Sequence, residues 1–277
     1  MFKEQHIIND QDLEKLLEEV SIQYDYDFTQ YSKASIKRRL NRLCYLDKFS
    51  SFAELRYRVL NDENYLQHFV EEITVNVTEM FRDPSFYQSL REDIMPHLGT
   101  YPFIRIWVAG CSTGEEAYSL AILLKETNLY DRSLIYATDI NPGVLEKARK
   151  GIFPLSQMKQ YSENYINSGG RADFSQYYTA NYEVAKFSTD LRSKMIFSTH
   201  NLVSDSSFNE FQLIICRNVL IYFERELQNR VFNLFDASLD HLGFLALGSK
   251  ETIKFSSLEQ SYKQIGTERI WRKIKSV

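Results

Sequence analysis

A short glycine turn carries the residues whose types and spacing are best suited to binding a ligand or catalysing a reaction. Residues 110–114 read Gly-Cys-Ser-Thr-Gly, follow an apolar run at 104–108 and precede two acids, Glu115 and Glu116. In α/β folds a ligand binds where a strand ends and a helix begins, because glycine lets the backbone come close and the first N–H groups of the helix are free. Three kinds of chemistry use such a turn.

Two of these chemistries fit the surrounding sequence poorly. The turn matches the G-x-S-x-G elbow of serine hydrolases, for which His200 or His241 could serve as the later histidine. Such an elbow normally follows several strands and a glycine-rich oxyanion segment, whereas the chain before residue 104 has a helical pattern. A dinucleotide site needs a third glycine, and the acids Glu115 and Glu116 would repel a pyrophosphate at the helix start.

The third chemistry is the binding of S-adenosylmethionine, which carries an ammonium and a sulfonium and no phosphate. Acids at the start of the helix then become favourable. Asp139 follows a second apolar run at 134–138 and is suited to accept hydrogen bonds from both ribose hydroxyls. Each acid alone could equally be a solvated carboxylate, but their order along the chain favours the adenosylmethionine site.

The elements that must position these residues alternate between strands and helices. Strands are predicted at 104–108, 134–138, 195–198, 211–216, 244–247 and 269–274, and helices at 115–125, 142–150 and 224–241. This alternation predicts an α/β fold with a doubly wound parallel sheet. The stretch 174–197, rich in Tyr, Phe, Val and Thr, interrupts the alternation and predicts a small antiparallel insertion.

The first 70 residues predict a small helical domain with an uneven charge distribution. Residues 1–30 hold two basic and eight acidic side chains, whereas residues 31–60 hold eight basic and two acidic ones. A basic stripe lies on or beside one predicted helix and consists of Lys33, Lys37, Arg38, Arg39 and Arg42. The stripe could be a solvated face, a nucleic-acid site or a docking surface for an acidic protein, and the near-neutral domain as a whole favours docking.

Composition excludes several classes of protein. The chain has 277 residues, 44% hydrophobic and 25% charged, which is typical of a globular protein with a sizeable core. The three cysteines lack C-x-x-C spacing and the five histidines lack an H-E-x-x-H motif, so no metal site is predicted. No stretch approaches the ~20 apolar residues of a membrane span, and no signal peptide is evident, so we expect a cytoplasmic protein.

Five motifs, in order along the chain, resemble those of the CheR-type chemotaxis receptor methyltransferases. They are Asn-Val-Thr-Glu-Met-Phe-Arg at 76–82, Gly-Cys-Ser-Thr-Gly-Glu-Glu at 110–116, Ala-Thr-Asp-Ile at 137–140, Asn-Leu at 201–202 and Cys-Arg-Asn-Val-Leu-Ile-Tyr-Phe at 216–223. The resemblance covers essentially the whole chain. One departure is Ala117, where the family commonly has proline, and alanine should be tolerated because proline at a helix start only presets φ.

The resemblance implies a fold, an activity and partners. The fold is an N-terminal all-helical domain (1–72) and a Rossmann-like S-adenosylmethionine-dependent methyltransferase domain (73–277), with an antiparallel β-subdomain inserted at about 174–198. The activity is protein-glutamate O-methylation, in which S-adenosylmethionine gives methyl esters on the acidic helical region of chemoreceptors. The enzyme would be a cytoplasmic monomer without metal, nucleic acid or membrane insertion. The alternative is a non-catalytic relative that binds S-adenosylmethionine and docks a signalling partner.

The resemblance also implies which residues form the site. Those that would contact the cofactor are Asn76, Thr78, Arg82, Glu116 (or its neighbour Glu115), Asp139, Asn201, Leu202, Arg217 and Asn218. Arg82 and Tyr222 are expected to be catalytic, Arg82 by orienting the acceptor carboxylate and Tyr222 by hydrogen bonding near the transferred methyl. A glutamate with a pKa near ~4.3 is already ionised at neutral pH, so the reaction needs alignment and no general base.

Overall fold

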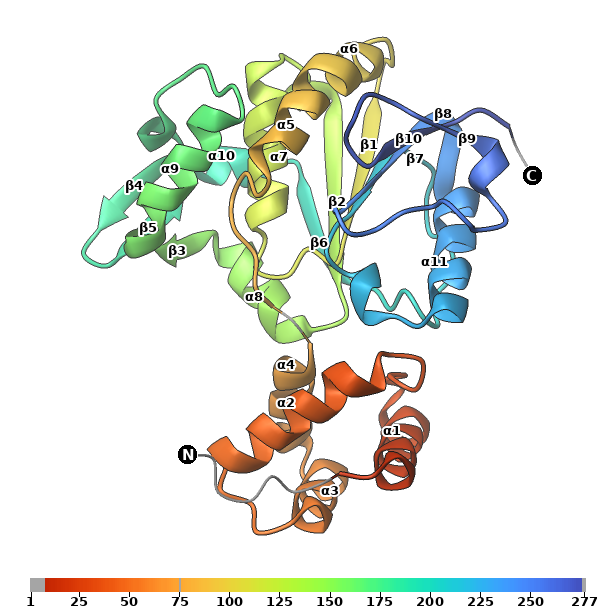
Figure 1. The fold of residues 1–277 in the computed structure, drawn as a ribbon. Coiled ribbons are helices and arrows are strands. Elements are labelled where there is room, and N and C mark those ends of the chain that lie inside the picture. Colours follow the sequence, from red (N-terminus) through yellow and green to blue (C-terminus); the bar gives the residue numbers. More distant parts are fainter. Residues whose placement is uncertain (1–7, 75, 276–277) are drawn as a thin grey trace. The chain divides into compact units, whose positions relative to one another are not determined.

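The chain divides into two units in the computed structural model, which describes residues 8–74 and 76–275 (Figure 1). One unit is Met1–Asn76 together with Tyr222–Arg230, and the other is Val77–Ile221 together with Val231–Val277. The expected division between residues 72 and 73 did not anticipate that a segment near residue 225 groups with the N-terminal helices.

The first unit contains helices with capped ends and an apolar side. Asn9 accepts a hydrogen bond from the backbone N–H of Asp12 at the first helix, and Asp62 caps the fourth helix through the N–H groups of Asn64 and Tyr65. Such caps satisfy N–H groups that have no partner inside the helix. The all-helical N-terminal domain is confirmed. Its helices are α1 (Asp10–Tyr24), α2 (Lys33–Leu46), α3 (Phe52–Asn61) and α4 (Glu63–Ile73).

A seven-stranded sheet organises the described part of the second unit, with the order β6-β2-β1-β7-β8-β10-β9. The first five strands of this order pair in parallel, as the alternation of strands and helices predicts, and β10 and β9 pair antiparallel at one edge, so the complete sheet is mixed. The strands are β1 (Ile104–Ala109), β2 (Ser133–Asp139), β6 (Met195–Thr199), β7 (Phe211–Cys216), β8 (Leu239–Leu247), β9 (Tyr262–Gln264) and β10 (Ile270–Lys273).

The strand order reverses between β1 and β7. The chain passes from β1 to β2 on one side and later returns to β7 on the other side of β1. Residue pairing is in register, with Ala109 beside Thr138 and Val108 beside Ile215. The carboxyl ends of β1, β2 and β7 therefore meet at a topological switch point, where open α/β sheets bind ligands.

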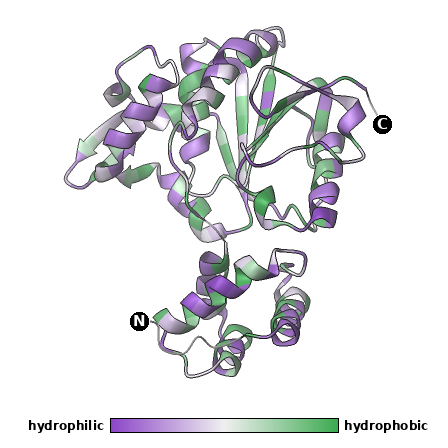
Figure 2. Ribbon diagram, viewed as in Figure 1, coloured by the Kyte–Doolittle hydropathy of each residue, from purple (hydrophilic) through white to green (hydrophobic). Residues whose placement is uncertain are grey.

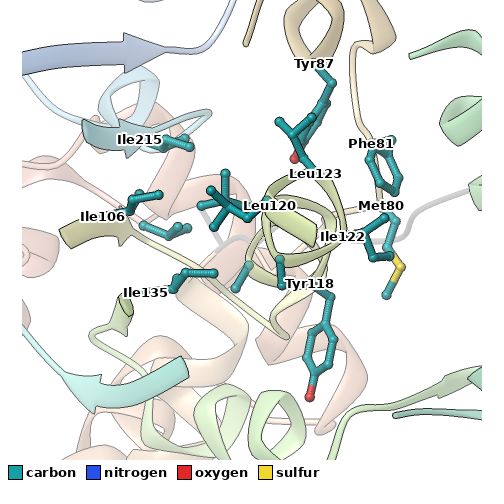
Figure 3. Packing of buried hydrophobic residues seen from close by; sticks show 14 of the residues in the cluster. Met80, Phe81, Tyr87, Ile106, Tyr118, Leu120, Ile122, Leu123, Ile135 and Ile215 are labelled. Atoms are coloured by element: carbon teal, nitrogen blue, oxygen red, sulfur yellow. The ribbon is translucent and has the colours of Figure 1, made fainter. Parts of the chain in front are cut away.

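Helices cover both faces of this sheet. Figure 3 shows α7 (Glu115–Glu126) with Leu120 directed toward the strand residue Ile106, and with Met80, Phe81 and Tyr87 on other sides of the helix. On the opposite face, the ring of Trp107 lies 5.3 Å from the ring of Phe235 in α11 (Arg225–Ser238). Hydrophobic residues run along the central strands, whereas the helices carry hydrophilic residues on their outer sides (Figure 2).

Further helices surround these layers. The helix α8 (Pro142–Lys150), which sequence analysis predicts, packs beside β2 and β6. Several others carry no clear signal in the sequence because they are short or weakly periodic. They are α5 (Pro84–Ser89), a π-helical turn (Leu90–Ile94), α6 (Met95–Leu98), α9 (Met158–Asn167) and α10 (Thr189–Arg192).

The small antiparallel sheet predicted as an insertion is confirmed, with the strand order β3-β5-β4. Its strands are β3 (Ile152–Pro154), β4 (Tyr178–Asn181) and β5 (Val184–Phe187). Its extent differs from the expected range 174–198, because β3 precedes that range and β6 pairs with β2 in the large sheet. Phe153 and Phe187 stack edge to face at 5.4 Å, and this non-local contact accompanies the pairing of β3 with β5.

The predicted helix at 224–241 is too long at its carboxyl end. The structure ends α11 at Ser238 and begins β8 at Leu239, which pairs with Phe211 of β7 across an irregularity in register. The helix therefore ends three residues earlier than the helical pattern in the sequence predicts, because the chain pairs with β7 from Leu239 onward. Pairing with a distant strand outweighs local periodicity here.

Candidate active site

The glycine turn lies where the ends of β1, β2 and β7 meet, and it contacts the residues at or just after each end. The N–H groups of Gly110 and Cys111, which follow β1, donate to the carbonyl oxygen of Thr138 in β2 at 2.8 and 2.9 Å. Gly110 has a φ of 73°, and a Cβ there would lie 2.4 Å from Cγ2 of Val219, in the loop after β7. Glycine is thus required both by the backbone conformation and by the close approach of this loop.

Asp139 is hydrogen-bonded to the turn. Its Oδ2 accepts from the N–H of Ser112 at 2.8 Å, and its Oδ1 accepts from the N–H of Asn141 at 3.0 Å. The residue is buried, and burial raises the pKa of its carboxyl against the opposing effect of these N–H groups. The turn and the acid that follows β2 are therefore held as one structure.

The two acids at the start of α7 have different surroundings, although both are buried. Oε2 of Glu115 accepts from the hydroxyl of Thr113 at 2.6 Å, and Oε1 lies 3.5 Å from the hydroxyl of Tyr161. Burial raises the pKa of Glu115 to about 7, against the weaker effect of these hydroxyls. Glu116 instead accepts from Nη1 of Arg217 at 2.8 Å, so a buried cation balances its charge.

Arg217 links three segments of the second unit. Besides Glu116, its guanidinium contacts Oδ2 of Asp83 at 2.6 Å and the carbonyl oxygen of Arg82 at 3.1 Å, and it lies 4.1 Å from the centre of the Phe86 ring. Asp83 has a φ of 56°, an uncommon conformation for a residue other than glycine. The loop after β7, the turn before α5 and the start of α7 are thereby held together.

The other predicted site residues make local contacts. Nη1 of Arg82, which is half-buried, donates to the carbonyl of Val77 at 3.3 Å. Oδ1 of Asn201 accepts from the N–H of Val203 at 3.0 Å. Three further residues of the predicted cofactor site are Thr78, which is half-buried, Leu202, which is buried, and Asn218, which has a φ of 60°.

Two predicted residues belong to the first unit. Nδ2 of Asn76 donates to the carbonyl of Glu71 at 3.2 Å and to the hydroxyl of Thr74 at 3.1 Å. The ring of Tyr222 lies 5.6 Å from the guanidinium of Arg39, within cation–π distance.

The geometry does not support a serine hydrolase. In the described residues, the buried Oγ of Ser112 has no hydrogen-bond partner. Nε2 of His200 instead lies 3.3 Å from the carbonyl oxygen of Ser206, and its ring packs 5.0 Å from that of Trp107. Burial also raises the pKa of the Cys111 thiol well above its ordinary value. Among the described residues, neither Ser112 nor Cys111 is hydrogen-bonded to a base that could activate it, as covalent catalysis requires.

Residues 8–74 and 76–275 contain no cluster of three or more His, Cys, Asp or Glu side chains that could hold a metal ion. None of the helices described is long and apolar enough to cross a membrane.

Sequence comparison decides the family. Residues 76–270 match the CheR methyltransferase, SAM binding domain, and residues 11–74 match the CheR methyltransferase, all-alpha domain. The chain belongs to the CheR methyltransferase family. It is a methyltransferase that depends on S-adenosylmethionine, and the two family domains occupy the helical unit and the sheet-containing unit.

Individual CheR relatives match over most of the chain. A protein named Cher3 from Pseudomonas putida is 46% identical over 265 residues, which is 95% of this chain and 97% of that one. The chemotaxis protein methyltransferase of Listeria innocua is 32% identical over 82% of this chain and 84% of its own, and that of Salmonella typhimurium is 33% identical over 83% and 77%. Among solved structures, a magnesium protoporphyrin IX methyltransferase from Synechocystis has a TM-score of 0.38 and 14% identity, covering 79% of this chain and 94% of that one.

One residue beside this CheR site carries no signal in the sequence analysis. The carboxylate of Glu251, which follows β8, is buried and accepts hydrogen bonds from backbone N–H groups in the loop after β7. The pattern Gly-Ser-Lys-Glu at 248–251, placed after an apolar strand, is the only local hint, since an isolated acid there resembles any solvated turn residue.

The raised pKa of Glu115 predicts a pH-dependent effect on the stability of this CheR enzyme. The folded state keeps the proton up to about pH 7, whereas the unfolded state loses it near the ordinary glutamate pKa of 4.5. Glu115 therefore makes the free energy of unfolding fall as the pH rises from 4.5 to 7, by ~3 kcal/mol in total.

Denaturant unfolding of Glu115→Gln and of the unmodified enzyme, without cofactor, checks this expectation. The stability of the variant relative to the unmodified enzyme should rise as the pH is raised from about 5 to about 7.5, with the difference growing by ~2.4 kcal/mol. The comparison cancels the titration of other buried acids. A difference that stays constant over this range would contradict the prediction.

Proposed function

We propose that this CheR-family enzyme methylates glutamate side chains of chemoreceptors in the cytoplasm and forms glutamyl methyl esters. The observation that carries the proposal is that relatives named chemotaxis protein methyltransferase match more than four-fifths of the chain, including both of its domains. The chemistry of the candidate site supports it independently.

The buried acids fit a cationic cofactor with free hydroxyl groups. Asp139 and Glu115 are both buried at the carboxyl edge of the sheet, and burial raises the pKa of each. A positively charged ligand would stabilise the ionised form of these carboxylates. We propose that Asp139 accepts hydrogen bonds from the ribose hydroxyls of S-adenosylmethionine, while the turn at 110–114 lets the cofactor approach the backbone.

Of the paired acids, Glu115 suits contact with the cofactor better than the expected Glu116. The charge of Glu116 is already balanced by Arg217, whereas the partners of Glu115 are the neutral hydroxyls of Thr113 and Tyr161. The family resemblance supports cofactor contacts for further residues, which remain proposals: Asn76, Thr78, Arg82, Asn201, Leu202, Arg217 and Asn218.

The chain's own residues need only to align the reactants. S-adenosylmethionine, when bound, supplies an electrophilic methyl group on a sulfonium. The acceptor glutamate is ionised at neutral pH, so its oxygen attacks in line without a general base, and water exclusion favours the loss of opposite charges. We propose that Arg82 orients the acceptor carboxylate and that the hydroxyl of Tyr222 donates a hydrogen bond near the methyl.

The basic stripe on α2 supports docking of an acidic substrate. Lys33, Lys37 and Arg42 pair with acids of their own unit, Glu14, Asp10 and Glu72 respectively. Arg38 is exposed on the same helix. Exposed ion pairs contribute little to stability, so these cations stay accessible to a negatively charged helical surface and can steer its approach.

A methyl-transfer assay tests the function. The enzyme, S-adenosylmethionine labelled in the methyl group and a chemoreceptor cytoplasmic fragment should yield labelled receptor whose label alkali releases as methanol, as expected of an ester. Arg38→Glu should lower kcat/KM for the receptor about tenfold at low salt and less at high salt, because screening weakens exposed charges.

Calorimetry and a control variant separate docking from loss of the fold. Binding of S-adenosylhomocysteine to Arg38→Glu should stay unchanged. The control is Lys15→Glu, which reverses the charge of an exposed side chain on α1 and should leave kcat/KM for the receptor near that of the unmodified enzyme. Label that resists alkali, or transfer to small molecules but not to receptors, would refute the proposed substrate. An Arg38→Glu enzyme with unchanged kcat/KM would refute docking through α2.

A further inference from the structure

The carboxylate of Glu251 gathers backbone N–H groups from two segments. Its Oε1 accepts from Val219 at 2.9 Å and Ile221 at 3.3 Å. Its Oε2 accepts from Asn218 at 3.0 Å and Gly248 at 2.7 Å. Each oxygen thus receives at least two donors, and the residue is only 4% exposed.

The loop that Glu251 holds begins at the carboxyl end of β7, at the switch point of the sheet. Asn218 has a φ of 60°, in the left-handed region that asparagine adopts more readily than most residues other than glycine. Arg217 precedes it and carries the ion pair with Glu116. The loop also approaches the glycine turn, since Val219 occupies the space that a Cβ on Gly110 would need.

The end of β8 is shaped to let this contact form. A Cβ on Gly248 would lie 2.7 Å from Oε2 of Glu251 and 2.9 Å from the backbone nitrogen of Asn218. Only glycine leaves room for the carboxylate to reach the amides of the neighbouring loop. The segment 248–251 therefore fixes the loop after β7 through the hydrogen bonds of the Glu251 carboxylate.

We propose that Glu251 is a positioning residue for cofactor binding, because its carboxylate holds the backbone at 218–221 and thereby presents Asn218 to S-adenosylmethionine. This inference rests on the proposed contact between Asn218 and the cofactor. Glu251 itself need not touch the cofactor or the acceptor.

Only a carboxylate satisfies all of these donors. A glutamine keeps the length and shape of the side chain but replaces one acceptor oxygen by an NH₂ group, which is a donor. Whichever oxygen is replaced, two backbone N–H groups then face another donor and lose their partner. Hydrogen bonds to a charged acceptor are also the stronger ones, so the loop should loosen in Glu251→Gln.

Calorimetric titration of the full chain with S-adenosylhomocysteine tests the proposal. Glu251→Gln should raise the Kd about tenfold or more, and should raise KM for S-adenosylmethionine similarly while kcat changes little. Glu126→Gln is the matched control, because Glu126 is also buried and also accepts a backbone N–H, that of Arg171, but lies at the far end of α7. It should lower stability and leave the Kd unchanged.

Gly248→Ala is a second variant in case Glu251→Gln does not fold. Its added methyl would push against both the carboxylate of Glu251 and the amide of Asn218, so it should raise the Kd by disrupting their contact without changing residue 251 itself. A folded Glu251→Gln or Gly248→Ala enzyme with the unmodified Kd and KM would overturn the proposal. Absence of binding by the unmodified enzyme would instead refute the proposed function on which it rests.

Discussion

Asp139→Asn should raise the Kd for S-adenosylhomocysteine by about 100-fold or more, because the two hydrogen bonds proposed from the ribose hydroxyls to its carboxylate contribute roughly 1.5–3 kcal/mol each. In the structure both oxygens accept backbone N–H groups, from Ser112 and Asn141. In asparagine the NH₂ group would face one of these N–H donors, and that hydrogen bond would be lost. The negative charge that is proposed to bind the ribose hydroxyls would also be lost. Isothermal titration calorimetry measures the change directly.

Ser112→Ala is the control for this prediction. It keeps the backbone N–H that donates to Asp139 and removes only a buried hydroxyl that has no hydrogen-bond partner among the described residues. Its Kd and methyl-transfer rate should therefore match those of the unmodified enzyme. If Asp139→Asn folds, as judged by circular dichroism, and binds with unmodified affinity, then Asp139 serves only the turn and the proposed cofactor contact is wrong.

Arg217→Met should lower the free energy of unfolding by ~3–5 kcal/mol, because it removes one partner of a buried ion pair and leaves the other charge uncompensated. The side chain of Arg217 is 3% exposed and that of Glu116 is 11% exposed, so water cannot replace the missing cation. The variant should also lose most of its methyl-transfer activity, because Arg217 holds the carbonyl of Arg82 and the carboxylate of Asp83. Urea unfolding and the transfer assay measure the two effects.

The double variant Arg217→Met with Glu116→Gln isolates the cause. Removing the stranded charge should restore part of the stability lost in Arg217→Met alone, so the two substitutions should not be additive. Additive losses would show that the ion pair contributes nothing beyond the separate packing of its members. Activity should stay low in the double variant, because the turn at Arg82 still lacks its anchor.

The elements around the glycine turn could be predicted because their signals are local. The apolar run at 104–108, the turn at 110–114 and proline at the start of α8 lie within single strands, turns and helices, and the structure has β1, α7 and α8 close to the predicted bounds. Leu13, Leu16, Leu17 and Val20, whose spacing along the chain is that of one side of a helix, are likewise buried in α1. Where a distant strand decides the outcome, as at Leu239, local periodicity predicts the wrong element.

The choice of partners among charged residues could not be predicted from spacing. Glu115 and Glu116 are adjacent and chemically identical, yet a helix turns by about 100° per residue, so their side chains meet different neighbours. Arg217, 101 positions after Glu116, balances one acid and leaves the other with hydroxyl partners. The surroundings of Glu251 are likewise set by the fold, because backbone amides from two segments donate to this solitary acid.

The sequence by itself determined the two domain types, the alternation of strands and helices, the position of the glycine turn and the resemblance to the CheR family, because each depends on residue types that are close along the chain. Only the tertiary structure decided which acid is paired, that Arg217 anchors the turn at Arg82, and that Glu251 holds the loop after β7. These contacts join segments tens of residues apart, and the free energy of a buried charge depends on which groups the fold brings within hydrogen-bond distance.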